Sequence, residues 1–350
     1  MNRSMIARDM NKVEIKHSRS LSQNLIVTRT PLRISFAGGG TDLAAFYEHE
    51  FGAVLSTAID KYIYVTVKRH GDLFNEPVRL NYSKTELVKE IDEIENNIVR
   101  ESLRFLEIDP PLYISTVADL PASTGLGGSS SFAVGLLNAL HAFRGERVSA
   151  GQLAEEASHI EIDVIKEPIG KQDQYPAAFG GLNLFRFNPG GGVTVEPLHM
   201  SNGVLNNFFD HILIFWTGMR RDASSVLNEQ NYNTPQNTEF LLKMRQHAHK
   251  LHSFINNGQF DVPAFGRVLD ETWQLKRQLA SNITNEQIDN WYKLAIEAGA
   301  EGGKICGAGG GGFLLFFVKP KRKKAVIQAL SSLTQVPIGY EAHGSQLLLP

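Results

Sequence analysis

The sequence predicts a protein of mixed α and β structure with two domains. Its 350 residues exceed the size of one typical hydrophobic core. Apolar residues alternate at Leu32, Ile34 and Phe36, which is the period of a half-buried strand, whereas residues 132–140 form an apolar run of helical length. Both kinds of signal recur along the chain. These observations favour the α+β class.

The composition indicates a soluble cytoplasmic protein that acts on a small molecule. Apolar residues make up 42% and charged residues 21% of the chain, as in ordinary globular proteins. A net charge of −2 provides no field for nucleic acid or an anionic membrane. The single cysteine, Cys306, permits no internal disulfide and fits a reducing compartment. Because no apolar run is long enough for a membrane span or a signal core, we expect neither a nucleic-acid nor a membrane partner. The sequence leaves open whether the protein forms a homodimer.

The first part of the chain contains a tight turn that ends in a hydroxyl and a carboxylate. Residues 1–24 are polar and aperiodic, which predicts a mobile extension. Strands are expected at 25–30 and 32–36, and Gly38 to Gly40 then lead to Thr41 and Asp42. Such a pair suits recognition of sugar hydroxyls. The alternative is that it caps a helix over residues 43–50.

The next segments lead the chain into a loop rich in glycine and serine. Residues 52–68 predict two strands, residues 84–105 an amphipathic helix, and residues 112–117 a strand. Residues 121–131 then open directly into the apolar helical run. Glycines allow a close approach to a ligand, and the amino end of a helix attracts anions, so a nucleotide phosphate fits here. The alternative is a glycine-rich turn before a buried helix.

A second candidate site follows the helix expected over residues 150–166. That helix carries Glu161 and Asp163, and Pro168 ends it. Lys171 and Asp173 lie one residue apart in the loop beyond. A carboxylate beside a cation stays ionised, which suits a base acting on a sugar hydroxyl. The alternative is a solvated loop ion pair.

The second half of the chain has its own strands, helices and glycine loop. The boundary is expected within residues 188–207, and an apolar strand covers 211–216. The loop beyond it carries Arg220 and Arg221, which could hold an anionic group or simply be solvated. Helices fill much of 238–300. A glycine-rich loop over 302–312 then precedes an apolar strand.

Three of these segments resemble, in the correct order, the motifs of the GHMP kinases. In the first motif, Pro121, Gly125, Leu126, Gly127 and Ser129 match, whereas Gly128 and Ser130 replace the usual serine and alanine. The second match is the loop over residues 170–174. The third is the glycine loop at 305–309, where Cys306 stands in place of the usual hydroxyl residue.

The resemblance implies a two-domain fold and a nucleotide cofactor. An N-terminal domain like domain 2 of ribosomal protein S5 would cover residues 25–205, and a ferredoxin-like C-terminal domain would cover 206–350. The cofactors would be ATP and Mg²⁺, with Ser129 and Glu161 as metal ligands and Asp163 as the alternative acidic ligand. The residues implied for ATP binding are Pro121, Gly125, Leu126, Gly127, Gly128, Ser129, Ser130 and Ser131.

The resemblance also implies a phosphoryl transfer to a sugar hydroxyl. Asp173 would be the base, and Arg33 and Lys171 would supply positive charge. The substrate-binding residues implied are Gly39, Gly40, Thr41, Asp42, Gln174, Arg221, Gly309 and Gly310. The A-G-G-G-T-D spelling is most similar to kinases that phosphorylate the anomeric hydroxyl of D-glycero-D-manno-heptose 7-phosphate. The alternatives are an unphosphorylated sugar such as fucose or galactose, or a nucleotide-binding regulator without turnover.

Overall fold

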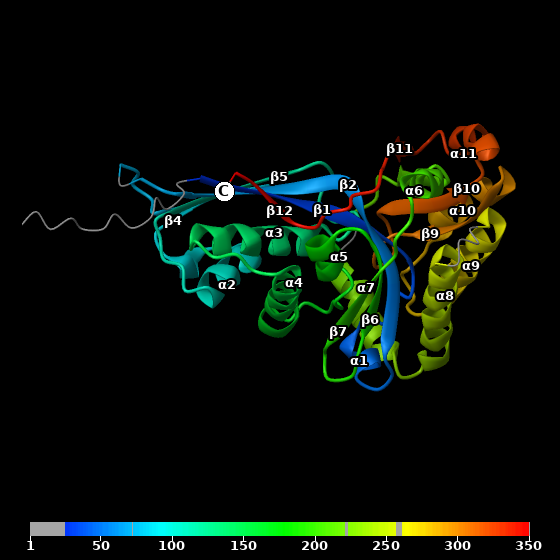
Figure 1. The fold of residues 1–350 in the computed structure, drawn as a ribbon, viewed down its shortest axis with the longest axis horizontal. Helices are drawn as coiled ribbons and strands as arrows, with labels where there is room; N and C mark the ends of the chain where they lie inside the picture. The colour runs from blue at the N-terminus through cyan, green and yellow to red at the C-terminus, as the bar shows by residue number, and fades with distance from the viewer. Residues whose placement is uncertain (1–24, 72, 221–222, 257–260, 350) are drawn as a thin grey trace, which may run out of the picture.

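The computed structural model describes residues 25–71, 73–220, 223–256 and 261–349 as two β-sheets with helices packed against them (Figure 1). The extension predicted for residues 1–24 lies outside the described residues. Each sheet organises one half of the molecule, as the predicted α+β class requires. The functional site lies where segments from the two halves meet.

The first sheet has eight strands, most of them in the order β12-β1-β2-β5-β3-β4, and β6 pairs with both β2 and β7. Their bounds are β1 (Leu25–Ala37), β2 (Gly52–Arg69), β3 (Val78–Asn81), β4 (Thr85–Val88), β5 (Leu112–Ala118), β6 (Leu182–Phe187), β7 (Val193–Pro197) and β12 (Gln346–Leu349). The two strands expected over 52–68 are one long strand, β2. Its first half pairs with β6 and its second half with β5, while β1 runs beside it throughout.

Helices cover one face of this sheet (Figure 1). They are α2 (Asn97–Phe105), α3 (Gly128–Phe143), α4 (Ala150–Ser158), α5 (Gln174–Phe179) and, after α4, the π-helix η2 (His159–Val164), with α1 (Ala44–Tyr47) and α6 (Asn202–Phe209) at the junction with the second half. Helix α3 packs on β1 and β2 and is buried nearly all round, as its apolar sequence predicts. Gly135 permits this packing, because a Cβ there would lie 2.6 Å from Oγ1 of Thr30.

The amphipathic helix predicted over residues 84–105 is wrong in its first half. Strand β4 and a short 3-10 helix, η1 (Ile91–Glu93), occupy that part, and α2 begins only at Asn97. The side chain of Asn96 accepts a hydrogen bond of 3.1 Å from the backbone N–H of Val99. This cap defines the start of α2, whereas the residues before it gain backbone partners by pairing β4 with β3.

The second sheet is antiparallel, with the order β11-β8-β10-β9. Its strands are β8 (Ile212–Trp216), β9 (Ala300–Ile305), β10 (Phe313–Val318) and β11 (Thr334–Val336). The helices of this half are α7 (Ala223–Asn233), α8 (Thr238–Asn256), α9 (Val262–Lys276), α10 (Glu286–Glu297), η3 (Pro320–Arg322) and α11 (Lys323–Ala329). Every residue of β10 is buried, which agrees with its unbroken apolar sequence. Part of the glycine loop expected over 302–312 is strand, since Gly302 and Gly303 lie in β9.

The two halves share a hydrophobic core. The ring of Phe208 lies 5.4 Å from that of Phe36 and 5.3 Å from that of Phe265, and Phe265 lies 4.6 Å from Phe317. These four rings come from α6, β1, α9 and β10. In addition, β12 returns from the second half to pair with β1. The domain boundary between residues 205 and 206 stays a prediction. It assigns β12 to the C-terminal domain, although β12 pairs with β1 in the first sheet.

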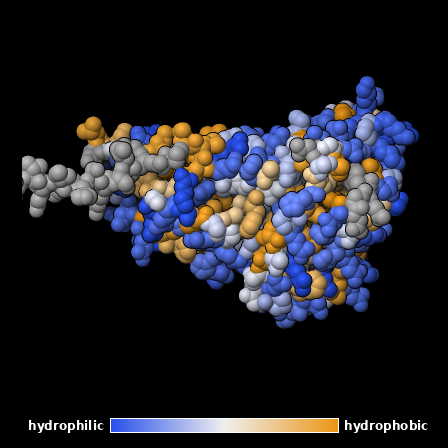
Figure 2. Space-filling view, viewed as in Figure 1, coloured by the Kyte–Doolittle hydropathy of each residue, from blue (hydrophilic) through white to orange (hydrophobic). Residues whose placement is uncertain are grey.

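The other face of the large sheet is open over part of its area. Figure 2 shows apolar residues gathered toward the end where β5 and β12 lie, with polar residues over much of the remainder. Val117 of β5 and Leu349 of β12 are exposed there. Among the described residues, no helix is both long and apolar enough to cross a membrane.

Candidate active site

A cavity of about 800 Å³ lies between the two halves of the molecule. Residues 120–125 and 127–130, much of the segment 167–173 and the later part of β1 line it from the first half. Helices α7 and α9 and the glycine loop at 306–311 line it from the second. The three segments singled out in the sequence therefore meet at one cavity.

The glycine–serine loop runs along this cavity into α3. Gly125 and Gly127 have φ of 80° and 76°, which a residue with a side chain rarely adopts, and Gly127 caps α3. A Cβ on Gly125 would lie 2.4 Å from the carbonyl oxygen of Cys306, so the first and third glycine loops pack backbone to backbone. Of the predicted ATP-binding residues, those that line the cavity are Pro121, Gly125, Gly127, Gly128, Ser129 and Ser130. The amino end of α3 thus opens onto the cavity, where an anionic group gains from it.

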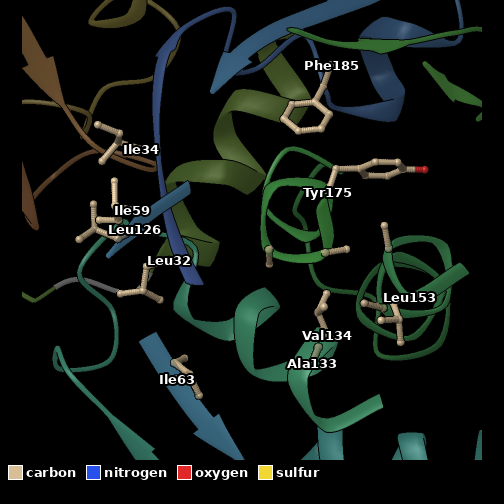
Figure 3. Close-up of a cluster of buried hydrophobic side chains, with 14 of the residues drawn as sticks. Leu32, Ile34, Ile59, Ile63, Leu126, Ala133, Val134, Leu153, Tyr175 and Phe185 are labelled. Carbon is tan, nitrogen blue, oxygen red and sulfur yellow. The ribbon is translucent and has the colours of Figure 1, made fainter. Parts of the chain in front are cut away.

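Two predicted ATP-binding residues do not line the cavity. Leu126 is fully buried in a cluster with Leu32 and Ile59 (Figure 3), and its carbonyl oxygen accepts a hydrogen bond of 3.1 Å from the backbone N–H of Arg33. The hydroxyl of Ser131 donates to the carbonyl oxygen of Pro31 at 2.8 Å. Because both are engaged in the protein interior, they hold the loop in place rather than face a nucleotide.

Arg33 and Asp173 form an ion pair in the wall of the cavity. The Arg33 side chain is 2% exposed, and its Nε and Nη2 donate to Oδ1 of Asp173 at 2.8 and 2.6 Å. Its Nη1 donates to the carbonyl oxygen of Gly125 at 2.8 Å. Among the described residues, Oδ2 of Asp173 takes part in no hydrogen bond. The pair therefore leaves one carboxylate oxygen, on a side chain that is 26% exposed, available to a hydroxyl in the cavity.

The predicted pairing of Lys171 with Asp173 is wrong. The ammonium of Lys171 lies 3.0 Å from a carboxylate oxygen of Glu155 and donates to the carbonyl oxygen of Gly191 at 2.7 Å. Lys171 lines a separate, smaller hollow. The cation beside Asp173 is Arg33, which is 140 positions away in sequence and adjacent only because β1 carries it there.

Asp42 also lines the cavity and is fully buried. Its Oδ1 accepts from the backbone N–H of Gly40 at 2.8 Å and from the amide of Gln172 at 3.0 Å. Burial raises the pKa of Asp42, and the nearby charge of Asp173 raises it further. The carboxylate is thus held rigidly by donors and aimed at the cavity.

Three other residues predicted to bind substrate make contacts within the protein instead. The hydroxyl of Thr41 donates to the carbonyl oxygen of Gly38 at 2.8 Å and accepts from the N–H of Ala53 at 3.0 Å, so it closes the turn before Asp42. Gly39 lies against the side chain of Gln172. The N–H of Gly310 donates to Ile283. Gly40 and Gly309 do line the cavity, whereas Arg221 lies outside the described residues.

Glu161 and Ser129 face one another at the phosphate end of the cavity. Oε1 of Glu161 accepts from the Ser129 hydroxyl at 3.0 Å, and Oε2 accepts from the amide of Gln174 at 2.7 Å. Gln174, predicted as a substrate contact, is therefore a support for Glu161. Burial raises the pKa of Glu161 to about 7. Asp163, the alternative metal ligand, is exposed and bonds His159.

These groups fit the implied magnesium ion. A hydroxyl and a carboxylate are the oxygen ligands that Mg²⁺ prefers. Among the described residues, Glu161 forms no salt bridge, so its buried carboxylate lacks a compensating cation in the protein. A bound cation would supply it.

Sequence reasoning missed one lysine that lines the cavity. Lys276, at the end of α9, lines the cavity, and its Nζ donates to the carbonyl oxygen of Gly307 at 2.6 Å. Burial lowers the pKa of Lys276 to about 8. Lys304 in β9 donates to the carbonyl oxygen of Ser35 at 2.8 Å, and burial lowers its pKa to about 7. Lys276 belongs to no local motif and reaches the cavity only through the packing of the second half on the first. Lys304, in contrast, precedes Ile305 and Cys306 in the third motif, and it is not among the residues that line the cavity.

Comparison with known proteins agrees with this geometry. Residues 96–181 match the family described as GHMP kinases N terminal domain, and residues 253–334 match GHMP kinases C terminal. The chain is 30% identical over 319 residues to the D-glycero-alpha-D-manno-heptose 7-phosphate kinase of Campylobacter jejuni subsp. jejuni serotype O:2, an alignment that covers 87% of this chain and 93% of the relative. It is 24% identical to the galactokinase of Pyrococcus furiosus, with 87% and 92% covered.

Solved structures show the same fold. A D-glycero-D-manno-heptose 1-phosphate kinase from Bacteroides thetaiotaomicron superimposes with a TM-score of 0.75 at 26% identity, with 93% of this chain and 99% of that chain covered. The galactokinase of Lactococcus lactis complexed with galactose has a TM-score of 0.72 at 19% identity, with 93% and 95% covered. The protein is therefore an ATP-dependent phosphotransferase with an alcohol group as acceptor. Within that class it belongs to the GHMP kinases, which use ATP and Mg²⁺.

Proposed function

We propose that this kinase phosphorylates the anomeric hydroxyl of D-glycero-D-manno-heptose 7-phosphate, giving the 1,7-bisphosphate for nucleotide-activated heptose synthesis. The single observation that carries the acceptor chemistry is that Oδ2 of Asp173 has no hydrogen-bond partner among the described residues, while its other oxygen is held by Arg33. The identity of the sugar is supported by the name of the Campylobacter relative and by the A-G-G-G-T-D turn.

In this mechanism, Asp173 orients the acceptor hydroxyl and accepts its proton through Oδ2. The Arg33 guanidinium holds the carboxylate in one orientation, because it donates two hydrogen bonds to Oδ1. Asp42, held by Gly40 and Gln172, binds a further hydroxyl of the sugar and so orients the acceptor.

Positive charge at the acceptor end comes from Arg33 and from Lys276 in place of Lys171. Lys276 is buried, lines the cavity and uses one donor on Gly307, so its remaining N–H groups can face an anionic group. As the phosphoryl group moves, negative charge spreads over its oxygens, and fixed cations stabilise it. The backbone N–H groups at the start of α3 bind the other phosphates of the nucleotide.

Ser129 and Glu161 would hold Mg²⁺ in this scheme. When bound, the ion neutralises charge on the nucleotide phosphates. Gln174 orients the Glu161 carboxylate through its hydrogen bond of 2.7 Å.

The test is release of ADP from Mg·ATP across a panel of acceptors. The two heptose-kinase relatives are named for different phosphates, so the panel contains the heptose 7-phosphate and the heptose 1-phosphate, together with mannose 6-phosphate, fucose, galactose and mevalonate. We expect selective turnover of the heptose 7-phosphate, with phosphate found on the anomeric oxygen by NMR. Turnover of only an unphosphorylated sugar would agree with the proposed mechanism but refute the heptose 7-phosphate as the substrate. ATP binding without transfer to any acceptor would refute the proposed function.

A further inference from the structure

The side chain of Gln230 completes the acceptor end of the cavity from the second half of the molecule. Gln230 lies on α7, lines the cavity and is only 2% exposed. Among the described residues its Oε1 has no hydrogen-bond partner. An unpartnered buried amide oxygen destabilises the protein, so its presence in a ligand cavity indicates that a ligand supplies the donor.

Position 40 favours glycine both for its backbone conformation and because this side chain lies close to it. A Cβ on Gly40 would lie 2.5 Å from Nε2 of Gln230, and the φ of Gly40 is +103°. The structure shows that the space beside Gly40 is filled by the Gln230 amide. Because the N–H of Gly40 donates to Oδ1 of Asp42, that amide lies next to the turn that holds the carboxylate.

We propose that Gln230 is a specificity-determining residue, which accepts a hydrogen bond from the acceptor hydroxyl adjacent to the one bound by Asp42. Asp42 and Gln230 line the same cavity, and Nε2 of Gln230 lies against the turn that holds the carboxylate, so the amide and the carboxylate can bind neighbouring hydroxyls of a polyol. The site would then discriminate against an acceptor that lacks one of these hydroxyls, since the buried Oε1 would stay unpaired. This inference rests on the proposed function only in that the acceptor is a sugar.

The test compares the wild type with Gln230→Met, which keeps the length of the side chain and removes the amide. The control is Asn228→Ala, on the same helix but exposed and outside the cavity. Calorimetric titration of each sugar in the panel, without ATP, measures binding directly, and steady-state kinetics give KM for acceptor and for ATP. In Gln230→Met we expect the acceptor Kd and KM to rise about tenfold, the loss of one hydrogen bond at a buried site, with KM for ATP unchanged.

Two further readouts separate recognition from a structural role. Gln230→Met removes an unpaired buried acceptor, so it should unfold at the same temperature as the wild type or a higher one. Single-deoxy analogues of the acceptor should show one position where the wild type loses about tenfold in affinity and Gln230→Met loses nothing further. Equal acceptor affinity in the two proteins would overturn the role of Gln230 while leaving the proposed function intact. A wild type that binds no sugar of the panel would overturn both.

Discussion

Replacing Asp173 with asparagine tests the central step of the mechanism. The side chain keeps its shape and an oxygen that can accept from Arg33, but it loses the ability to take a proton through Oδ2. General-base catalysis contributes at least about a hundredfold, which corresponds to about 2.7 kcal/mol in the barrier. We therefore expect kcat to fall by about a hundredfold or more.

The same change also costs stability, because Arg33 is almost fully buried. Removing one partner of a buried ion pair costs about 3–5 kcal/mol. The carboxylate is 26% exposed, and Arg33 keeps its bond to the carbonyl oxygen of Gly125, so we expect about 1–2 kcal/mol. The variant should stay folded and bind ATP nearly as well as the wild type.

The assay measures ADP release under saturating acceptor, with ATP affinity from calorimetry and the unfolding free energy from denaturant titration. Asp163→Asn is the matched control, because Asp163 is exposed and bonds only His159 among the described residues. Near-normal kcat in folded Asp173→Asn would refute the assignment of Asp173 as the base.

Three more predictions concern titrating groups. Burial raises the pKa of Glu161 to about 7, so the folded state binds the proton more tightly than the unfolded chain. In thermal unfolding, the metal-free wild type should therefore gain stability as pH falls through 7, whereas Glu161→Gln should not. In metal titration, the affinity of the wild type for Mg²⁺ should weaken over the same pH range. Burial lowers the pKa of Lys276 to about 8, so kcat/KM of the wild type should fall above pH 8. In Lys276→Arg, which stays charged, this fall should begin at a higher pH. An unchanged pH profile would rule out Lys276 as the titrating cation. Burial disfavours the charged form of His141, but hydrogen bonds of 2.7 Å to Glu156 and Glu146 outweigh it and raise the pKa above 6.5. The stabilisation relative to His141→Gln should therefore be complete below pH 6.5 and be lost as pH rises above it, and a constant difference in unfolding free energy between pH 5.5 and 9 would contradict this.

The sequence by itself determined the family, and it singled out the glycine–serine loop and three carboxylates that line the cavity. Gly127 caps α3 within the loop singled out over residues 121–131, and Asp42, Asp173 and Glu161 all line one cavity. Asp42 could be found because it directly follows Gly40 and Thr41, and Asp173 because its loop resembles a motif of the family, whereas no local motif marked Glu161. Local spacing reports local backbone geometry, and the resemblance supplied the order of the segments.

Only the tertiary structure decided which charges pair and which polar side chains are left for a ligand. Lys171 is two residues from Asp173 but bonds Glu155, whereas Arg33 reaches Asp173 from a different strand. Lys276 and Gln230 come from helices of the second half and enter the cavity only when its sheet packs on β1. Ion pairing and burial depend on distances across the fold, and sequence separation does not encode those distances.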